Sequence, residues 1–188
     1  MAQMRLADFI EFSNIYRQHM TADFPAEELK PLSVIEKMYA LGKYETFVFE
    51  EDGQIKAYAS FIWHHKEVRL LDYFAVTRDA GRGTGIGSWF LTELTATVKA
   101  KGFILECEVP EKAANDTEKN LREKRIAFYE RNGAVMTPVR VKVFDVDFLL
   151  LYMPVGEALE NINVRDEFIN IYHNITPREL FQRNVSIS

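Results

Sequence analysis

The sequence predicts a mixed α/β domain with one largely antiparallel sheet flanked by helices, followed by a short C-terminal helical extension. The apolar pattern changes from helical spacing near the N-terminus to alternation after residue 44. Two hairpin-like pairs of strands enclose a single strand–helix–strand crossover. The chain has 188 residues, which suits one domain with a sizeable core. We assign residues 1–154 to the main domain and 155–188 to an extension that packs on it.

The first half of the chain is expected to contain two helices and then three strands. In order, these elements are helices over 7–20 and 33–41 and strands over 45–51, 54–64 and 67–76. Ser33 is expected to cap the second helix, with Glu36 completing a capping box. The pair Asp52-Gly53 is a hairpin signal, so the first two strands should be antiparallel neighbours.

The second half is expected to alternate helices and strands before the helical tail. In order, these elements are a helix over 85–101, a strand over 103–109, a helix over 119–132, strands over 135–143 and 146–153, and an amphipathic stretch over 163–173. Gly102 and Gly133 should each lie just past the end of a helix. In the tail, Thr176 should cap a last helix, with Pro177 in its first turn and Glu179 completing a capping box.

The composition indicates which partners the protein can bind and in which compartment it is found. The net charge of −5 is unsuited to nonspecific nucleic-acid binding, which needs clustered basic residues. Cys107 is the only cysteine, so the chain forms no internal disulfide and no Cys/His zinc site of the usual kind. No signal peptide is visible, and the apolar run that starts at Phe148 is too short to cross a membrane. We therefore expect a cytoplasmic protein with no metal, nucleic-acid or membrane partner.

Four glycines alternate between an apolar strand and an amphipathic helix: Gly81, Gly83, Gly85 and Gly87. Such a loop lets a ligand approach backbone amides, and a helix N-terminus adds unpaired N–H groups and partial positive charge. The two features together predict a phosphate or pyrophosphate cradle. The dinucleotide spacing G-x-G-x-x-G fails in every register, and no P-loop triplet follows. An acid at Glu106 or Glu108, where a ribose-binding residue would stand, keeps a nicotinamide-binding oxidoreductase open as an alternative.

Two motifs in this order resemble the GNAT superfamily of acyl-CoA-dependent N-acetyltransferases. The stretch "RGTGIG" matches the family's Q/R-x-x-G-x-G/A loop at Arg82, Gly85 and Gly87. The stretch "AFYERNGA" at 127–134 is similar to a second family segment, "FYEKxGF". The resemblance covers roughly residues 4–153. The sequence departs from the family pattern at Arg122, Arg125 and Ala134, which affects expected contacts along the cofactor arm.

The resemblance implies that acetyl-CoA is the co-substrate and assigns residues to it. The pyrophosphate would lie on the amides of the loop residues Arg82, Gly83, Thr84, Gly85, Ile86, Gly87 and Ser88. The backbone of the preceding strand would hold the pantetheine arm and polarise the acetyl carbonyl, through Phe74, Ala75 and Val76. Arg122 would add a contact to the arm. Tyr129 stands where the family commonly places its general acid, and an unperturbed tyrosine is protonated at neutral pH.

No motif identifies the general base. Glu106 and Glu108 share one face of the expected strand over 103–109, and Glu108 is nearer the end where ligands usually bind. Asp72 lies among apolar neighbours, where a carboxylate can become a better base. The catalytic candidates are therefore Tyr129, Glu108 and Asp72, with an ordered water as the alternative base. Cys107 alternates onto the apolar face and is interpreted as a buried thiol.

The acceptor is expected to be a primary amine, either on a small molecule or on a protein. Aromatic residues of the first helices and the last hairpin could line its cleft or belong to the core: Tyr16, Phe24, Tyr39, Tyr44, Phe144 and Phe148. The tail could pack on the domain, cover the cleft or mediate a homodimer. A non-catalytic acyl-CoA-binding regulatory module is the alternative to an enzyme.

Overall fold

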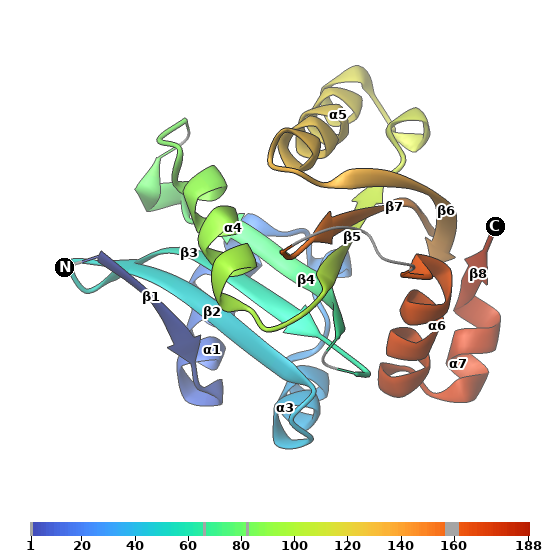
Figure 1. Cartoon of the computed structure of the whole chain (residues 1–188), viewed down its shortest axis with the longest axis horizontal. Coiled ribbons are helices and arrows are strands. Elements are labelled where there is room, and N and C mark those ends of the chain that lie inside the picture. The colour runs from blue at the N-terminus through green and yellow to red at the C-terminus, as the bar shows by residue number, and fades with distance from the viewer. Residues whose placement is uncertain (1, 66, 82, 157–161) are drawn as a thin grey trace. The chain divides into compact units, whose positions relative to one another are not determined.

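A computed structural model of the chain describes residues 2–65, 67–81, 83–156 and 162–188. Its strands are β1 (Ala2–Ala7), β2 (Tyr44–Glu51), β3 (Gln54–Ile62), β4 (Val68–Val76), β5 (Gly102–Glu108), β6 (Val135–Val143), β7 (Val146–Pro154) and β8 (Val185–Ile187). They follow the order β1-β2-β3-β4-β5-β7-β6-β8 (Figure 1). The pairs β1–β2, β2–β3, β5–β7, β6–β7 and β6–β8 are all antiparallel. The predicted class, a mixed α/β fold with a largely antiparallel sheet, is confirmed.

Helices connect these strands, and the contacts divide the chain into two compact units. The helices are α1 (Phe9–Ile15), α2 (Thr21–Asp23), α3 (Leu32–Ala40), α4 (Ile86–Thr97), α5 (Asp116–Arg131), α6 (Val164–Ile175) and α7 (Arg178–Asn184). A π-helical turn, Tyr16–Met20, joins α1 to α2, and short 3₁₀ turns lie at Ala26–Glu28, Arg78–Ala80 and Pro110–Lys112. The first unit comprises Met1–Trp63 and Leu71–Thr97, and the second comprises His64–Leu70 and Val98–Ser188.

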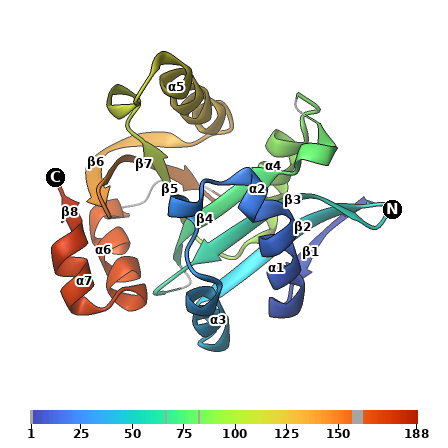
Figure 2. The ribbon, with the colours of Figure 1, turned by 180° about the vertical axis from the view of Figure 1, so that it is seen from behind.

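In the first unit, helices cover both faces of the strands. Helix α4 lies on one face (Figure 1), and α1 and α3 lie on the opposite face (Figure 2). Phe90 of α4 is fully buried and stacks on Phe74 of β4, with ring centroids 5.8 Å apart. Phe12 of α1 is equally buried and meets the Tyr44 ring edge-on at 5.7 Å. Aromatic side chains therefore form the core on both faces.

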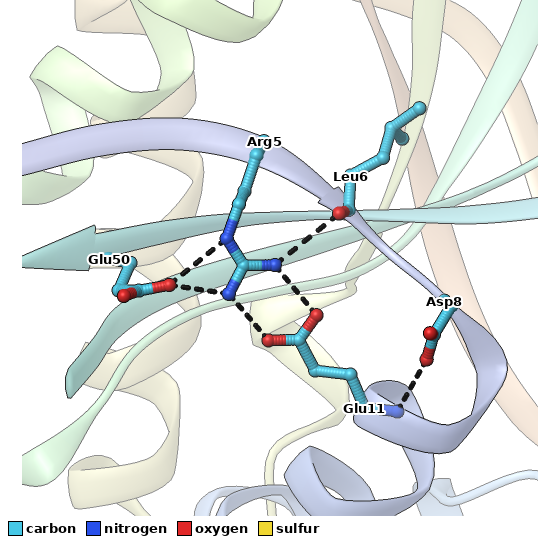
Figure 3. Close-up of polar contacts among 5 residues, drawn as sticks. All are labelled: Arg5, Leu6, Asp8, Glu11 and Glu50. Atoms are coloured by element: carbon cyan, nitrogen blue, oxygen red, sulfur yellow. Dashed lines mark hydrogen bonds and ion pairs between the residues drawn. The ribbon is translucent and has the colours of Figure 1, made fainter. Parts of the chain in front are cut away.

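Strand β1 was not predicted, and an ion cluster on Arg5 explains part of its position (Figure 3). Both Arg5 Nη atoms donate to Glu11 of α1 at 2.7 Å, while Nε and Nη2 donate to Glu50 of β2 at 3.0 and 2.5 Å. Hydrogen bonding to Glu11 and Glu50 raises the pKa of Arg5 further, so the cluster stays charged. The Asp8 side chain accepts from the Glu11 amide at 2.8 Å and caps α1. The helix expected over 7–20 therefore begins at Phe9.

In the second unit, β5, β7, β6 and β8 lie side by side, with α5 packed on β5 and α6 on β6. The Asn115 side chain accepts from the Glu118 amide and starts α5, three residues before the predicted boundary. Strand β8 was not predicted; Val185 to Ile187 pair with Val143 to Val141 of β6. The described residues of the tail therefore form two helices and one strand.

Two predicted side-chain caps are wrong. Ser33 lies inside α3, which begins after Pro31 without a side-chain cap. Thr176 follows the end of α6, and α7 begins after Pro177, again without a side-chain cap. Proline presets the backbone dihedral that suits a helix start, so it replaces the predicted side-chain caps in both places.

Gly102 does not end a helix: α4 ends at Thr97, and Gly102 is the first residue of β5. A Cβ atom at this position would lie 2.3 Å from Cζ and Oη of Tyr152 and 2.6 Å from the Met153 carbonyl oxygen. Glycine is therefore required here because the neighbouring strand β7 comes too close for any side chain.

Candidate functional site

The loop between β4 and α4 adopts the backbone that its glycines predicted. Gly81, Gly83 and Gly85 have φ values of 77°, 77° and 80°, a region that other residues rarely adopt. A Cβ atom at Gly83 or Gly85 would meet nothing within 4 Å. These two glycines are therefore needed for conformation and not for packing. Both residues are exposed, so the space above them is open to a ligand.

The loop runs directly into the N-terminus of α4. The Trp89 amide donates to Gly85 O at 3.0 Å and closes the first helical turn. The amides of the three preceding residues, Ile86, Gly87 and Ser88, therefore lie at the helix start, where N–H groups have no helical acceptor. Helix-start amides with partial positive charge suit an anion such as a pyrophosphate. Of the predicted loop residues, Arg82 lies outside the described residues.

Two side chains anchor the start of this loop. Thr77 is 1% exposed, and its hydroxyl contacts the carbonyl oxygens of Ile55 and Lys56 at 3.2 Å. Arg78 contacts the Ala22 carbonyl oxygen, and its Nε lies 3.5 Å from an Asp23 oxygen. Sequence reasoning missed Arg78, whose side chain is 72% exposed and adds a cation beside the glycines.

Strand β4 enters this loop with its last residues half-buried. Phe74, Ala75 and Val76 are less buried than the residues at the start of the strand. The Phe74 ring is held by its stacking on Phe90. The first unit therefore brings together the predicted arm-binding segment and the predicted pyrophosphate loop, as consecutive parts of one strand–loop–helix.

Asp72 of β4 belongs to a polar cluster that the sequence did not reveal. Its side chain is 1% exposed, and Oδ1 lies 2.5 Å from Lys30 Nζ. Its other oxygen accepts from the Tyr44 hydroxyl at 2.9 Å. The Lys30 ammonium also lies over the Tyr73 ring, 5.5 Å from the centroid. Lysine 30 comes from the segment between α2 and α3, so only the fold places it beside Asp72.

The aromatic residues predicted to line an acceptor cleft lie in different surroundings: the core, the polar cluster around Asp72, and the surface. Tyr39 and Tyr44 have ring centroids 5.2 Å apart, and Tyr44 is 3% exposed, so its ring lies in the core while its hydroxyl reaches Asp72. Phe24 meets the Tyr73 ring edge-on at 5.1 Å, close to the Lys30 ammonium. Phe144, in contrast, is 53% exposed at the turn between β6 and β7.

In the second unit, Tyr129 lies on α5 and is 8% exposed. Burial, and then the neighbouring Cys107, raise the pKa of its hydroxyl well above the usual value. Tyr129 therefore stays protonated at neutral pH and can donate a proton. Burial also raises the pKa of the Cys107 thiol to about 12, which leaves it protonated and unreactive. The interpretation of Cys107 as a buried thiol is confirmed.

Glu108 at the end of β5 is held by two arginines of α5. One oxygen lies 2.8 Å from Arg122 Nη2 and the other 3.1 Å from Arg125 Nη1. Arg122 also donates to the Val109 carbonyl oxygen at 2.8 Å and to Glu118 at 2.5 Å. Glu106, on the same strand, accepts from the Tyr172 hydroxyl of α6 at 2.7 Å. Both acids predicted to border an acceptor cleft are thus engaged by helical side chains of their own unit.

Two kinds of feature are absent from the described ranges. No helix in them combines the length and apolarity needed to cross a membrane. No group of three or more His, Cys, Asp or Glu side chains in them is arranged to hold a metal ion.

Comparison with known proteins gives a consistent set of matches. The sequence model of the acetyltransferase (GNAT) family matches residues 10–134. No curated protein matches the chain. A GNAT-family protein from Bacteroides thetaiotaomicron has a TM-score of 0.71 at 17% identity, and the match covers 92% of this chain and 95% of that one.

Two further solved structures share the fold. The ribosomal-protein-S18-alanine N-acetyltransferase from Escherichia coli has a TM-score of 0.59 at 21% identity, covering 86% of this chain and 99% of that one. A GNAT acetyltransferase from Elizabethkingia anophelis, solved with acetyl-CoA bound, has a TM-score of 0.54 at 15% identity, covering 81% and 97%.

Proposed function

From the premise that this chain belongs to the acetyltransferase (GNAT) family, we propose that it transfers the acetyl group of acetyl-CoA to a primary amine. The amine attacks directly, with both substrates bound. One observation carries the proposal: an exposed loop with left-handed glycines leads into the first amides of α4. Such a loop suits a pyrophosphate, and acetyl-CoA supplies one.

The first unit provides the groups proposed to hold the cofactor. The amides from Gly83 to Ser88 bind the pyrophosphate, and the backbone of the segment 74–76 holds the arm and polarises the acetyl carbonyl. Arg78 is an exposed cation at the start of the same loop and would turn toward a phosphate by leaving Asp23 and the Ala22 carbonyl oxygen. Arg82 and Arg122 are also proposed to contact the cofactor. Arg122 would keep its hydrogen bond to the Val109 carbonyl oxygen and would exchange one of its carboxylate partners for the cofactor.

The chemistry needs a proton acceptor, an oxyanion partner and a proton donor. The acceptor amine first loses one proton to become a nucleophile. Its nitrogen then forms a bond to the acetyl carbon and releases a second proton to solvent, and the carbon–sulfur bond breaks. We assign the proton for the leaving thiolate to Tyr129, because burial keeps its hydroxyl protonated. The tyrosine recovers its proton from solvent.

We assign the first proton transfer to Asp72 and a positioning role to Glu108. Glu108 is held by two guanidinium groups, which stay charged at all accessible pH values. Asp72 is held by one lysine ammonium and one neutral hydroxyl. Lysine is a flexible point charge, so Asp72 is the carboxylate that can more readily exchange its partner for a substrate amine.

The first experiment is thermal unfolding with acetyl-CoA, with NAD and ATP as controls. Acetyl-CoA at ~100 times its dissociation constant should add about 2.7 kcal/mol of stability. For a chain of this length that corresponds to a rise of roughly 5–10 °C in the unfolding midpoint. No rise with saturating acetyl-CoA would refute the loop assignment, and a rise with NAD alone would favour an oxidoreductase.

The second experiment measures release of CoA thiol with a panel of primary amines. Tyr129→Phe should lower kcat by about 10²-fold or more while acetyl-CoA still stabilises the variant. Phe128→Tyr, which adds a hydroxyl beside Tyr129 and removes none, is the matched control. Acetyl-CoA binding without release for any amine would indicate the non-catalytic acyl-CoA-binding module.

Three further assignments stay predictions. The boundary between residues 154 and 155 can be tested by expressing residues 1–154 alone. A homodimer can be tested by size-exclusion chromatography with light scattering. A cytoplasmic location can be tested by fractionation of the source cells.

A further inference from the structure

The Lys30 ammonium group lies between a carboxylate and an aromatic ring. Its Nζ lies 2.5 Å from Asp72 Oδ1 and 5.5 Å from the centroid of the Tyr73 ring. The Tyr44 hydroxyl, 2.9 Å from the second Asp72 oxygen, keeps the carboxylate oriented. Burial raises the pKa values of the Tyr44 and Tyr73 hydroxyls, so both stay neutral beside the Asp72 side chain. A carboxylate beside an aromatic face is the combination that recognises an organic cation.

The backbone of Lys30 is held independently of its side chain. Its amide donates to the Tyr73 hydroxyl at 2.8 Å, and its carbonyl oxygen accepts from the Tyr16 hydroxyl at 3.0 Å. The Tyr73 hydroxyl in turn donates to the Glu28 carbonyl oxygen at 3.0 Å. The lysine side chain can therefore leave the site by rotating about its own bonds while the segment before α3 stays in place.

Exposure differs sharply between the two charged partners. The Lys30 side chain is 28% exposed, while that of Asp72 is 1% exposed. Lys30 is thus the partner that solvent reaches, while the Asp72 carboxylate is covered by its surroundings. A buried carboxylate that loses its cation needs a new one, because an unpaired charge is costly in such surroundings.

The site also lies near the segment that the proposed function assigns to the acetyl group. Asp72 and Phe74 are two positions apart, about 7 Å along a strand. A lysine side chain and a primary amine acceptor present the same chemical group, R–NH3+, with three N–H donors. Lys30 therefore stands in for the very class of substrate that the proposed reaction requires.

We propose that Asp72, Tyr73 and Tyr44 form the binding site for the protonated amine of the acceptor, and that Lys30 fills this site until the acceptor displaces it. This inference rests on the proposed function and specifies where the acceptor binds. Binding exchanges one ammonium for another at Asp72, so the charge of the site does not change. Asp72 then takes one proton from the bound ammonium, which leaves the free amine for attack. Lys30 is a competitor built into the chain.

The test removes the competitor and supplies a small ammonium ion. Lys30→Ala should bind n-butylammonium chloride, seen as a saturable rise in its unfolding midpoint that equal concentrations of sodium chloride do not produce. The wild type should show a much weaker rise, and Lys30→Ala with Asp72→Asn should show none. A tethered competitor raises the apparent dissociation constant by the reciprocal of the fraction of time that the site is empty. The KM for n-butylamine in the thiol-release assay should therefore fall by about tenfold or more in Lys30→Ala.

Matched variants distinguish displacement of Lys30 by the acceptor from a purely structural ion pair. Lys101→Ala removes an exposed lysine paired with Glu67 at 3.2 Å and should leave both readouts at wild-type values. Lys30→Met keeps the apolar stem and replaces Lys30→Ala if the latter does not fold. An unchanged or higher KM without an n-butylammonium shift would make Lys30–Asp72 a structural ion pair and overturn the inference, while acetyl-CoA binding and turnover would leave the proposed function intact. If acetyl-CoA fails to stabilise even the wild type, the proposed function and this inference fall together.

Discussion

Replacing Gly102 with alanine should destabilise the protein far more than an average surface substitution. The new Cβ would lie 2.3 Å from two atoms of the Tyr152 side chain, whereas carbon atoms in contact prefer about 3.5–4.0 Å. Tyr152 is 1% exposed, and the third close atom, the Met153 carbonyl oxygen, is backbone. Neither partner can move away without disturbing the core or the β5–β7 pairing. Overpacking of this kind costs about 3 kcal/mol, which lowers the unfolding midpoint by about 6–12 °C.

The measurement is urea unfolding followed by circular dichroism, with thermal unfolding as a second readout. Gly42→Ala is the matched control, because Gly42 has a φ of 62° and its Cβ would meet nothing within 4 Å. That substitution should cost about 1 kcal/mol through backbone strain alone. Shortening the opposing side chain in Gly102→Ala with Tyr152→Leu should recover part of the loss. Equal losses at the two glycines would refute the steric explanation.

Other features lead to further predictions. Gly85→Ala should cost about 1 kcal/mol of stability through its φ of 80°, and calorimetry should show acetyl-CoA binding weakened by about tenfold; unchanged affinity would argue against a role for this backbone. Arg5→Met leaves two partly buried carboxylates without their cation, so urea unfolding should show a loss of about 1–2 kcal/mol, less at 1 M salt. Burial raises the pKa of the Cys107 thiol from about 9 to about 12, so its contribution is complete below pH 9 and is lost as pH rises toward 12. The stability of the wild type relative to Cys107→Ala should therefore fall by about 1.4 kcal/mol per pH unit between pH 9 and 11, and parallel pH profiles would contradict this assignment.

Features that depend on neighbours in the sequence were predicted well. The hairpin at Asp52-Gly53 is confirmed, with φ values of 50° and 75° at the two residues. The glycine loop and the segment "AFYERNGA" identified the family, and the match over residues 10–134 confirms that resemblance. Both succeeded because a turn with positive φ, or a loop before a helix, is specified by a few adjacent residues.

Features that depend on distant partners were missed or misread. Strand β1 exists through its pairing with β2 and the Arg5 ion cluster, and β8 exists through its pairing with β6. Both segments do alternate apolar and polar residues, but β1 has only six residues and leads directly into a helix, and β8 has only three. A short edge strand takes its conformation from the ladder that it joins, so a pattern this brief does not identify it.

The sequence by itself determined the fold class, the family and the loop proposed to hold a pyrophosphate, because local backbone chemistry specifies each of them. Only the tertiary structure decided why Gly102 is a glycine and what surrounds Asp72. Residue 30 and residue 72 are far apart along the chain, and no periodicity or motif relates them. Folding brings the Lys30 ammonium to the Asp72 carboxylate, because a buried charge must meet an opposite charge wherever the chain can provide one.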